Sequence, residues 1–341
     1  MRQVLKSVAM LLVGWFVFTL PAHAKPAYHL VATIALGEPD RWDYVVPDSA
    51  HHRVYVAHSD RLTVLDTATN MLVANIQGIA GGTHGTGISA ATGQGFTDDG
   101  QNGTAIAFDL KTLKIVKSIP ANEDADAITV DPATGHIFVV EGDPGTITVV
   151  DPKSDTAVAT INVGEKLEYA VADGTGAVFV AGNEKGDVIK IDAIANRVVA
   201  QWPVSGCTSP HGLAYDPASQ RLFMGCTNGV MMVVDAKSGR VVTSLPIGNG
   251  SDAVAFDTKR KRVFSSNGKD GTISIYKQIA PDRYELLETV QTAVSGRTMG
   301  VDEATGHLFV AAADTEPNPT PGGRPHVLPG TLKLLVFAPV D

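Results

Sequence analysis

The chain has 341 residues, of which 44% are hydrophobic, and its formal net charge is −9. This is ample material for a large folded core. The negative charge excludes the basic surface that drives nucleic-acid binding, and it also disfavours attraction to anionic lipid. We therefore do not expect nucleic acid as a partner.

Residues 1–24 have the three parts of a secretory signal peptide. Arg2 and Lys6 form a basic start, residues 8–20 are apolar, and a small-x-small sequence permits cleavage after Ala24. The alternative is a membrane anchor, but the apolar run is shorter than the roughly 20 residues that span a bilayer. We predict a periplasmic or secreted protein with no membrane span after cleavage, and a mature charge of about −11.

The mature chain, residues 25–341, repeats one unit of four short strands. Residues 126–164 show it most clearly, as AITV, HIFVV, TITVVD and AVATINV separated by Gly, Pro, Asp and Ser. In chain order, units start near residues 43, 84, 126, 168, 211, 252 and 297. A period of about 40–45 residues with four strands per unit is typical of a β-propeller.

The seventh unit lacks a fourth strand because the chain ends at Asp341. Residues 28–37, YHLVATIALG, have the pattern of a fourth strand, so we predict that they complete the last blade and close the ring. The fold class is all-β. We expect one seven-bladed β-propeller domain with four-stranded antiparallel blades, and a monomer.

Both cysteines fall in one local segment, GCTSPHGLAYDPASQRLFMGC, around the start of the fifth unit. If that segment forms an antiparallel hairpin, His211 sits roughly opposite Cys226, and Cys207 lies in the loop that enters the same strand. Exported proteins with an even number of cysteines usually pair them. We therefore favour a Cys207–Cys226 disulfide over two free thiols.

The residue just before the first strand is ionisable in all seven units. In a propeller these residues meet at one mouth of the central channel. They are Asp43, His84, Asp126, Glu168, His211, Asp252 and Arg297. Convergent polar groups in a concave place are the usual mark of a binding site, so all seven are candidate ligand-binding residues. The alternative is a channel lining that is charged only because it is wet.

Four of these mouth residues are also candidate metal ligands. His84, His211, Asp126 and Glu168 offer a donor set adequate for a divalent metal ion. The two histidines lie three blades apart, so both reach one ion only if the mouth is narrow. Either one could instead act as a general base near pH 7. The cofactor stays unknown beyond this metal ion, and no common catalytic signature identifies a catalytic residue.

Two further features belong to the same face. The second strands end in polar residues that we expect to serve the turns: His58, Asp99, Glu141 and Asn267. A Pro- and Gly-rich insertion, residues 314–330, interrupts the seventh unit. It is either a loop without a role or a lid that brings Arg324 and His326 towards a ligand.

The repeated phrases DPATGHIFVVEGDPGTITVVD and DPASQRLFMGCTNGVMMVVDAKSGRVV resemble the YVTN-type repeat. Over residues 28–339 the chain is similar to YncE-like bacterial propellers. The resemblance implies an exported seven-bladed propeller, without fixing its activity. Some YncE-like members are associated with DNA binding, from which this acidic chain departs. Some YVTN-type propellers belong to periplasmic redox proteins, and more remote propeller lyases and lactonases use a metal at the channel.

Two functions follow as hypotheses. The first is a binding or scaffold propeller that recognises a small molecule or a protein partner at the channel mouth. The second is a metal-dependent lyase or lactonase, in which His84 or His211 holds a metal or acts as base, with Asp126 and Glu168 as further ligands. A metal or redox accessory protein is a weaker third possibility. Whether the protein is an enzyme stays open.

Overall fold

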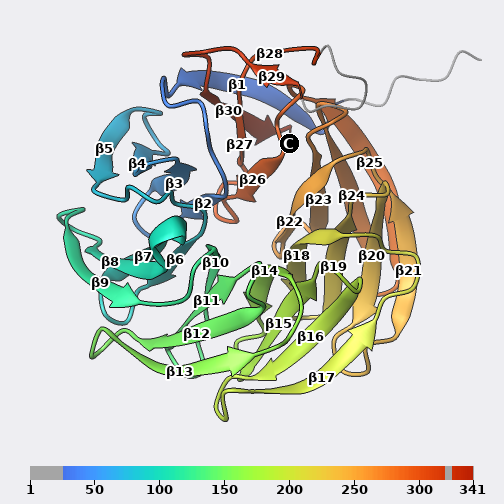
Figure 1. Ribbon diagram of the computed structural model, residues 1–341. Coiled ribbons are helices and arrows are strands. Elements are labelled where there is room, and N and C mark those ends of the chain that lie inside the picture. Colours follow the sequence, from blue (N-terminus) through green and yellow to red (C-terminus); the bar gives the residue numbers. More distant parts are fainter. Residues whose placement is uncertain (1–25, 319–324, 341) are drawn as a thin grey trace, which may run out of the picture.

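The structure, a computed structural model, describes residues 26–318 and 325–340; the predicted signal peptide lies outside them. In this described part, seven four-stranded antiparallel sheets are arranged as blades around a central axis (Figure 1). The predicted seven-bladed all-β propeller is therefore confirmed. The described helical structure is one short 3₁₀ turn, η1 (Gly100–Asn102). No helix in the described residues has the length and hydropathy needed to cross a bilayer.

In each of the first four blades, the strands follow one another in chain order from the channel outwards. Blade one contains β2 (Val45–Asp48), β3 (Arg53–His58), β4 (Arg61–Asp66) and β5 (Leu72–Gln77). Blade two contains β6 (Thr86–Ser89), β7 (Gln94–Asp99), β8 (Thr104–Asp109) and β9 (Ile115–Pro120). Blade three contains β10 (Ala125–Val130), β11 (Ile137–Glu141), β12 (Thr146–Asp151) and β13 (Thr156–Asn162). Blade four contains β14 (Leu167–Ala172), β15 (Ala177–Gly182), β16 (Asp187–Asp192) and β17 (Arg197–Pro203).

The last three blades have the same plan. Blade five contains β18 (Pro210–Asp216), β19 (Arg221–Cys226), β20 (Val230–Asp235) and β21 (Val241–Pro246). Blade six contains β22 (Ser251–Asp257), β23 (Arg262–Asn267), β24 (Thr272–Ala280) and β25 (Arg283–Gln291). Blade seven contains β26 (Thr298–Val301), β27 (Leu308–Ala312), β30 (Lys333–Pro339) and, as its outer strand, β1 (Tyr28–Ala35).

The ring closes as predicted, because the N-terminal strand completes the last blade. β1 runs antiparallel to β30, with Tyr28 opposite Pro339 and Ala35 opposite Lys333. The strand ends at Ala35, two residues earlier than the sequence pattern suggested. The carboxylate of Glu288 in blade six accepts hydrogen bonds from the backbone N–H groups of Ala27 and Tyr28. The N-terminal segment therefore joins blade seven to blade six as well as completing it.

Each blade buries one large aromatic side chain at the same position of its second strand. These residues, all at most 1% exposed, are Tyr55, Phe96, Phe138, Phe179, Phe223, Phe264 and Phe309. They pack between neighbouring sheets, where the hydrophobic clusters of the molecule lie. An aromatic side chain buries a large apolar area, so this repeated position is a main source of cohesion between blades.

In blades one and three, the polar residue at the end of the second strand ties the blade to the loop that enters it. Glu141 accepts hydrogen bonds from the hydroxyl of Thr146 and the backbone N–H of Asn122, and His58 Nε2 lies 2.7 Å from the carbonyl oxygen of Pro39. The Glu141 and His58 side chains are at most 1% exposed. These residues therefore act inside the blade, more deeply than the turn role expected of them.

Blade five makes the same connection with a covalent bond. Cys226, at the end of β19, forms a disulfide with Cys207 in the entering loop, with their Cα atoms 5.4 Å apart. The predicted disulfide is therefore confirmed. Pro210 lies opposite Cys226 in the ladder, one residue from the His211 position that the hairpin pattern suggested.

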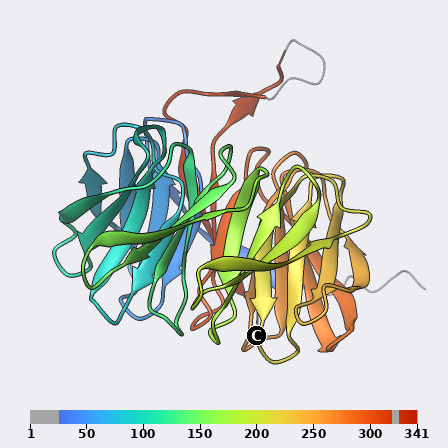
Figure 2. The same cartoon turned by 60° about the horizontal axis from the view of Figure 1, so that its bottom comes forward.

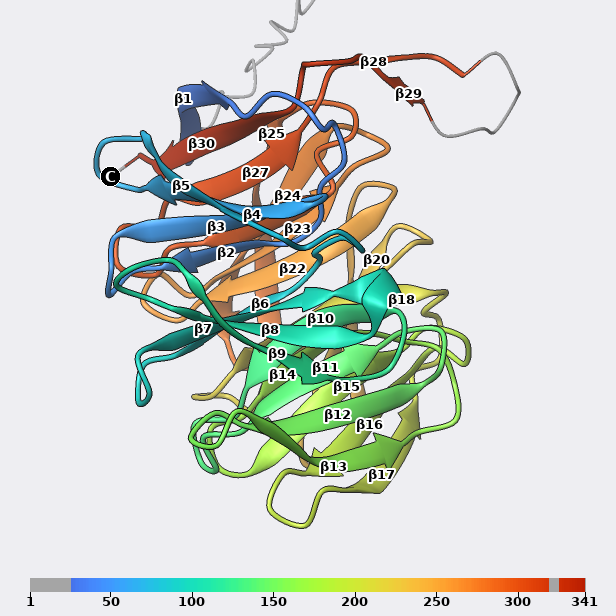
Figure 3. The same cartoon turned by 60° about the vertical axis from the view of Figure 1, so that its left-hand side comes forward.

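The insertion in blade seven forms a small hairpin, β28 (Thr315–Glu316) paired with β29 (His326–Val327). The hairpin stands out from one face of the ring (Figures 2 and 3), and it lies over the outer rim rather than over the centre (Figure 1). Its base is tied to the N-terminal loop, since Asp40 accepts hydrogen bonds from the N–H groups of Gly330 and Leu332. His326 is exposed on β29, and Arg324 lies outside the described residues, so their role as a lid stays a prediction.

Candidate functional site

The predicted mouth residues converge across the blades. The Arg297 guanidinium of blade seven lies 3.4 Å from the Asp43 carboxylate of blade one and 3.3 Å from the Asp252 carboxylate of blade six. Nε2 of His211 in blade five lies 3.6 Å from Oε1 of Glu168 in blade four. One ligand atom each of Asp43, His84 and Asp126 lies within 4.8 Å of the others. Residues far apart in sequence therefore share one rim.

Two glycines help to make the mouth narrow. Each candidate histidine is followed by glycine, Gly85 after His84 and Gly212 after His211. A Cβ atom at Gly85 would lie 2.5 Å from the backbone nitrogen of Ile128, and one at Gly212 would lie 2.4 Å from that of Val254. Only a residue without a side chain permits this approach of neighbouring first strands. The His-Gly pairs thus bring both histidines close to the axis.

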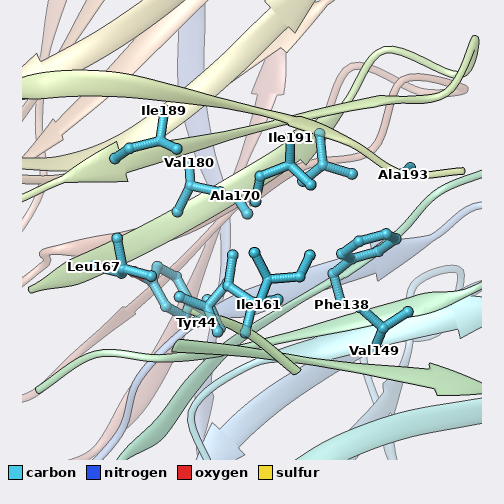
Figure 4. Packing of buried hydrophobic residues seen from close by; sticks show 14 residues of the cluster. Tyr44, Phe138, Val149, Ile161, Leu167, Ala170, Val180, Ile189, Ile191 and Ala193 are labelled. Atoms are coloured by element: carbon cyan, nitrogen blue, oxygen red, sulfur yellow. The ribbon is translucent and has the colours of Figure 1, made fainter. Parts of the chain in front are cut away.

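Two tyrosines lie directly below the mouth. Tyr44 follows Asp43, Tyr169 follows Glu168, and the two ring centroids are 4.8 Å apart. Tyr44 reaches from blade one into the cluster between blades three and four, where it lies beside Leu167 (Figure 4). Since blades one and four are not neighbours, this contact crosses the channel. The polar mouth therefore has an aromatic floor.

The other half of the channel is mostly apolar. Beyond the floor, a cavity of about 230 Å³ is lined by first-strand residues that include Val45, Leu213, Met299 and Tyr169. The ionisable residues of the ring thus belong to one face only, and a polar ligand has its partners on that face.

His84 is held in a fixed orientation by residues of blades two and three. Its Nδ1 lies 2.8 Å from Oδ1 of Asp98 and 3.1 Å from the carbonyl oxygen of Ala125. Because both neighbours are acceptors, Nδ1 carries the hydrogen. Nε2 is then the ring nitrogen left for a ligand, as in metal sites where a carboxylate orients a histidine.

Asp98 was not among the residues predicted from the sequence, which pointed to its neighbour Asp99. Its carboxylate is fully buried and also accepts the backbone N–H groups of His84 and Gly85. The pairing of the strands identifies the equivalent residues of the other blades, all apolar or small: Ala57, Val140, Ala181, Gly225, Ser266 and Ala311. One acid at a repeat position that is apolar or small in the other six units is a signal in the sequence that could have identified Asp98.

The four predicted metal ligands do not gather as one group. Within the described residues, the metal-compatible group is Asp43, His84 and Asp126, so His84 and Asp126 remain together while Asp43 joins them. Glu168 and His211 form a separate pair. Nδ1 of His211 lies 3.0 Å from the carbonyl oxygen of Ser209, which leaves its Nε2 towards Glu168. The seven-residue ring therefore has two chemically distinct halves.

Burial and crowding raise the pKa of two acids of the mouth, Asp43 and Asp126. Burial, reinforced by Asp252 and opposed by Arg297, raises the pKa of Asp43 to about 6. Burial, with repulsion from Asp43 and Glu168, raises the pKa of Asp126 well above its ordinary value. Burial lowers the pKa of His84, but the Asp98 carboxylate outweighs this and raises it to about 9. Negative charge at this rim is therefore costly unless a cation compensates it.

Replacing Glu168 by Gln tests this cost directly. Burial, with repulsion from Asp252 and Asp43, raises the pKa of Glu168 from 4.5 to about 8. The folded state is therefore favoured by this group below about pH 4.5 and loses that contribution as the pH rises through about 8. We expect Glu168→Gln to be more stable than wild type by on the order of 2 kcal/mol near pH 9, and equal to it near pH 4.

The measurement is the urea midpoint of both proteins across this pH range. The matched control is Glu316→Gln, at an exposed position on β28. A Glu168→Gln gain that is independent of pH, or a similar gain in the control, would show that Glu168 ionises without cost in the folded protein.

Comparisons with known proteins bear on the fold and, weakly, on the family. No protein-family model matches the chain. It is 23% identical over 190 residues to "Uncharacterized protein YncE" of Salmonella typhimurium and 22% identical to the protein of that name in Salmonella typhi. These matches cover 54% of this chain and 53% of each relative, so the chain spans about half the length of the curated relatives it matches.

Solved structures share the architecture at lower identity. Kuenenia stuttgartiensis hydrazine synthase superposes with a TM-score of 0.71 at 13% identity, covering 86% of this chain and 96% of that one. The WD40 repeats of RRP9 superpose with a TM-score of 0.76 at 10% identity, covering 93% and 98%. At these identities the likeness concerns the fold alone. The weak sequence similarity and the seven-bladed ring together fit a YncE-like propeller.

Proposed function

We propose that this protein is an exported, periplasmic binding protein whose channel mouth takes a small, positively charged ligand. The observation that carries the proposal is the imbalance of charge at the mouth. Arg297 is shared between Asp43 and Asp252 and His84 is paired with Asp98, while the Asp126 side chain makes no hydrogen bond or ion pair with any described residue. A cation between Asp126 and its neighbours would offset their mutual repulsion.

Several features support binding at this mouth over binding elsewhere on the ring. The polar groups of the mouth converge above the Tyr44–Tyr169 pair, and convergent polar groups are typical of a binding site. A cation bound among these carboxyls favours their ionised forms, so we expect positive ligands, and nucleic acid is not the proposed partner. The Cys207–Cys226 disulfide agrees with an oxidising compartment, to which a leader at residues 1–24 would direct the chain.

Thermal-shift measurements with defined probes test the proposal. Divalent metal chlorides, spermidine and choline serve as cations; citrate and inorganic phosphate serve as anions. We expect at least one cation, and neither anion, to raise the Tm of the mature protein. Bound ligand stabilises by mass action, by about 2.7 kcal/mol at one hundred times its Kd.

The Asp126→Asn, Glu168→Gln double variant keeps the shapes of both side chains while removing two carboxyls that can ionise against a bound cation. It should lose the response to the stabilising cation. The control is Asp60→Asn, which removes an acid that is exposed in the turn between β3 and β4. Stabilisation by an anion that depends on the mouth residues, or a cation response unchanged in the double variant, would contradict the proposal.

A further inference from the structure

We infer that Asp43, His84 and Asp126 form a binding site for one divalent transition-metal ion, with Asp98 as the residue that orients His84. The inference deepens the proposed function and rests on it, because it assigns the ligand class to one half of the mouth. The chain contributes the three ligand residues from the starts of blades one, two and three, which are consecutive around the ring.

The distances suit an ion without movement of the backbone. The three candidate ligand atoms lie within 4.8 Å of one another. Three ligands that share one ion with bonds of about 2.0–2.2 Å lie about 3.3–3.8 Å from one another. Side-chain rotations that shorten the longest of these separations by about 1 Å therefore bring all three atoms into contact with an ion.

The donor set selects the class of metal. One imidazole nitrogen and two carboxylates suit Zn²⁺, Co²⁺, Mn²⁺ or Fe²⁺, whereas Ca²⁺ and Mg²⁺ prefer oxygen ligands alone. Three protein ligands leave a coordination position open, which is typical of sites where the metal also holds water or a second ligand. The fourth ligand of the metal would then be a water molecule or a small molecule that enters through the channel mouth.

Two observations outside the ligand geometry point to an occupant of the mouth. Tyr44 is 5% exposed, yet its hydroxyl makes no hydrogen bond with the described residues, and it lies close enough to Asp126, Glu168 and Asp43 for their charges to act on it. A hydroxyl without a protein partner is free to hydrogen-bond to water or to a ligand oxygen. The second observation is the buried Asp98, since the six equivalent positions of the other blades carry no acid.

His211 is not one of the proposed metal ligands. Both histidines precede glycine at equivalent positions, but Nε2 of His211 lies 3.6 Å from Glu168 in the other half of the mouth. Replacing each of the two histidines by Ala therefore gives a matched pair of variants. One removes a proposed ligand, and the other removes a histidine of the same rim.

The experiment titrates the chelator-treated mature protein with Co²⁺, by calorimetry and by the visible absorption of the bound ion. We expect one Co²⁺ per chain. His84→Ala should weaken binding at least about 100-fold, while His211→Ala changes it by less than about threefold. Asp126→Asn should weaken binding at least about tenfold, and its fold is secure because Asp126 has no described partner to lose.

Asp98→Asn tests the orienting residue. Loss of a carboxylate behind a metal-bound histidine typically weakens metal binding about 10- to 100-fold. The Co²⁺ absorption should shift as well, because the ring loses its fixed orientation and some basicity. A merely structural role would change the Tm but leave the spectrum of the bound ion as in wild type.

Other outcomes overturn the inference. Equal losses in His84→Ala and His211→Ala would place the ion across the mouth, as the sequence alone suggested. Co²⁺ binding that survives both His84→Ala and Asp126→Asn would place it elsewhere. If Co²⁺ does not bind but spermidine or choline still stabilises wild type and not the double variant, the metal site fails and the proposed cation-binding function stands.

Discussion

Replacing Phe138 by Ala is expected to destabilise the propeller by about 3–5 kcal/mol. Phe138 is fully buried in the cluster between blades three and four (Figure 4), where Val149 and Val178 are among its companions. The substitution loses the transfer free energy of the ring and leaves a cavity that rigid neighbouring sheets cannot fill. The midpoint of urea unfolding, followed by far-UV circular dichroism, measures the effect.

The matched control is Val116→Ala on the outer strand β9. Val116 is 52% exposed, so its truncation should change stability by less than about 0.5 kcal/mol. Phe223→Ala, at the equivalent position of blade five, should resemble Phe138→Ala. If the two phenylalanine variants are as stable as the control, the repeated aromatic position does not hold the blades together.

Removing the disulfide should have the second largest effect. The Cys207–Cys226 bond closes a loop with a sequence separation of 19. Releasing a loop of this size from constraint costs on the order of 3 kcal/mol. Cys207→Ser with Cys226→Ser should therefore lower the urea midpoint substantially. The loop also carries Ser209, whose carbonyl fixes the His211 ring, so the His211–Glu168 half of the mouth should loosen with it.

Reductant supplies the control for this prediction. Dithiothreitol should lower the stability of wild type towards that of the double variant, and should leave the double variant unchanged. Binding of Co²⁺ should be little affected in either case, since the disulfide lies in blade five and the proposed ligands lie in blades one to three. Equal stability of the oxidised wild type and the double variant would show that the bond does not stabilise the fold.

The fold could be predicted because the number of repeat units and the number of strands they provide agree with a closed ring. Seven units of similar length, and a spare fourth-strand pattern at residues 28–37, leave one way to close the ring. The position of the mouth residues followed from the same symmetry, since equivalent residues of a propeller share a rim. The disulfide followed from local geometry within one hairpin.

The chemistry within the mouth could not be predicted to the same depth. Sequence equivalence places His84 and His211 at the same height, but it does not say which carboxyl lies beside each one. That depends on side-chain orientation, which Asp98 fixes for His84 and the Ser209 carbonyl fixes for His211. The insertion could also be predicted only in part. The composition of residues 314–330 indicates that they leave the blade, but it does not indicate towards which part of the ring they extend.

The most direct test of the metal site is a crystal structure of the mature protein soaked in Co²⁺, with data collected on both sides of the cobalt absorption edge. We expect one strong anomalous peak above the tyrosine floor, about 2.0–2.2 Å from Nε2 of His84 and from carboxylate oxygens of Asp43 and Asp126. A peak beside His211 and Glu168, or cobalt found only at scattered surface residues with the mouth empty, would contradict the assignment.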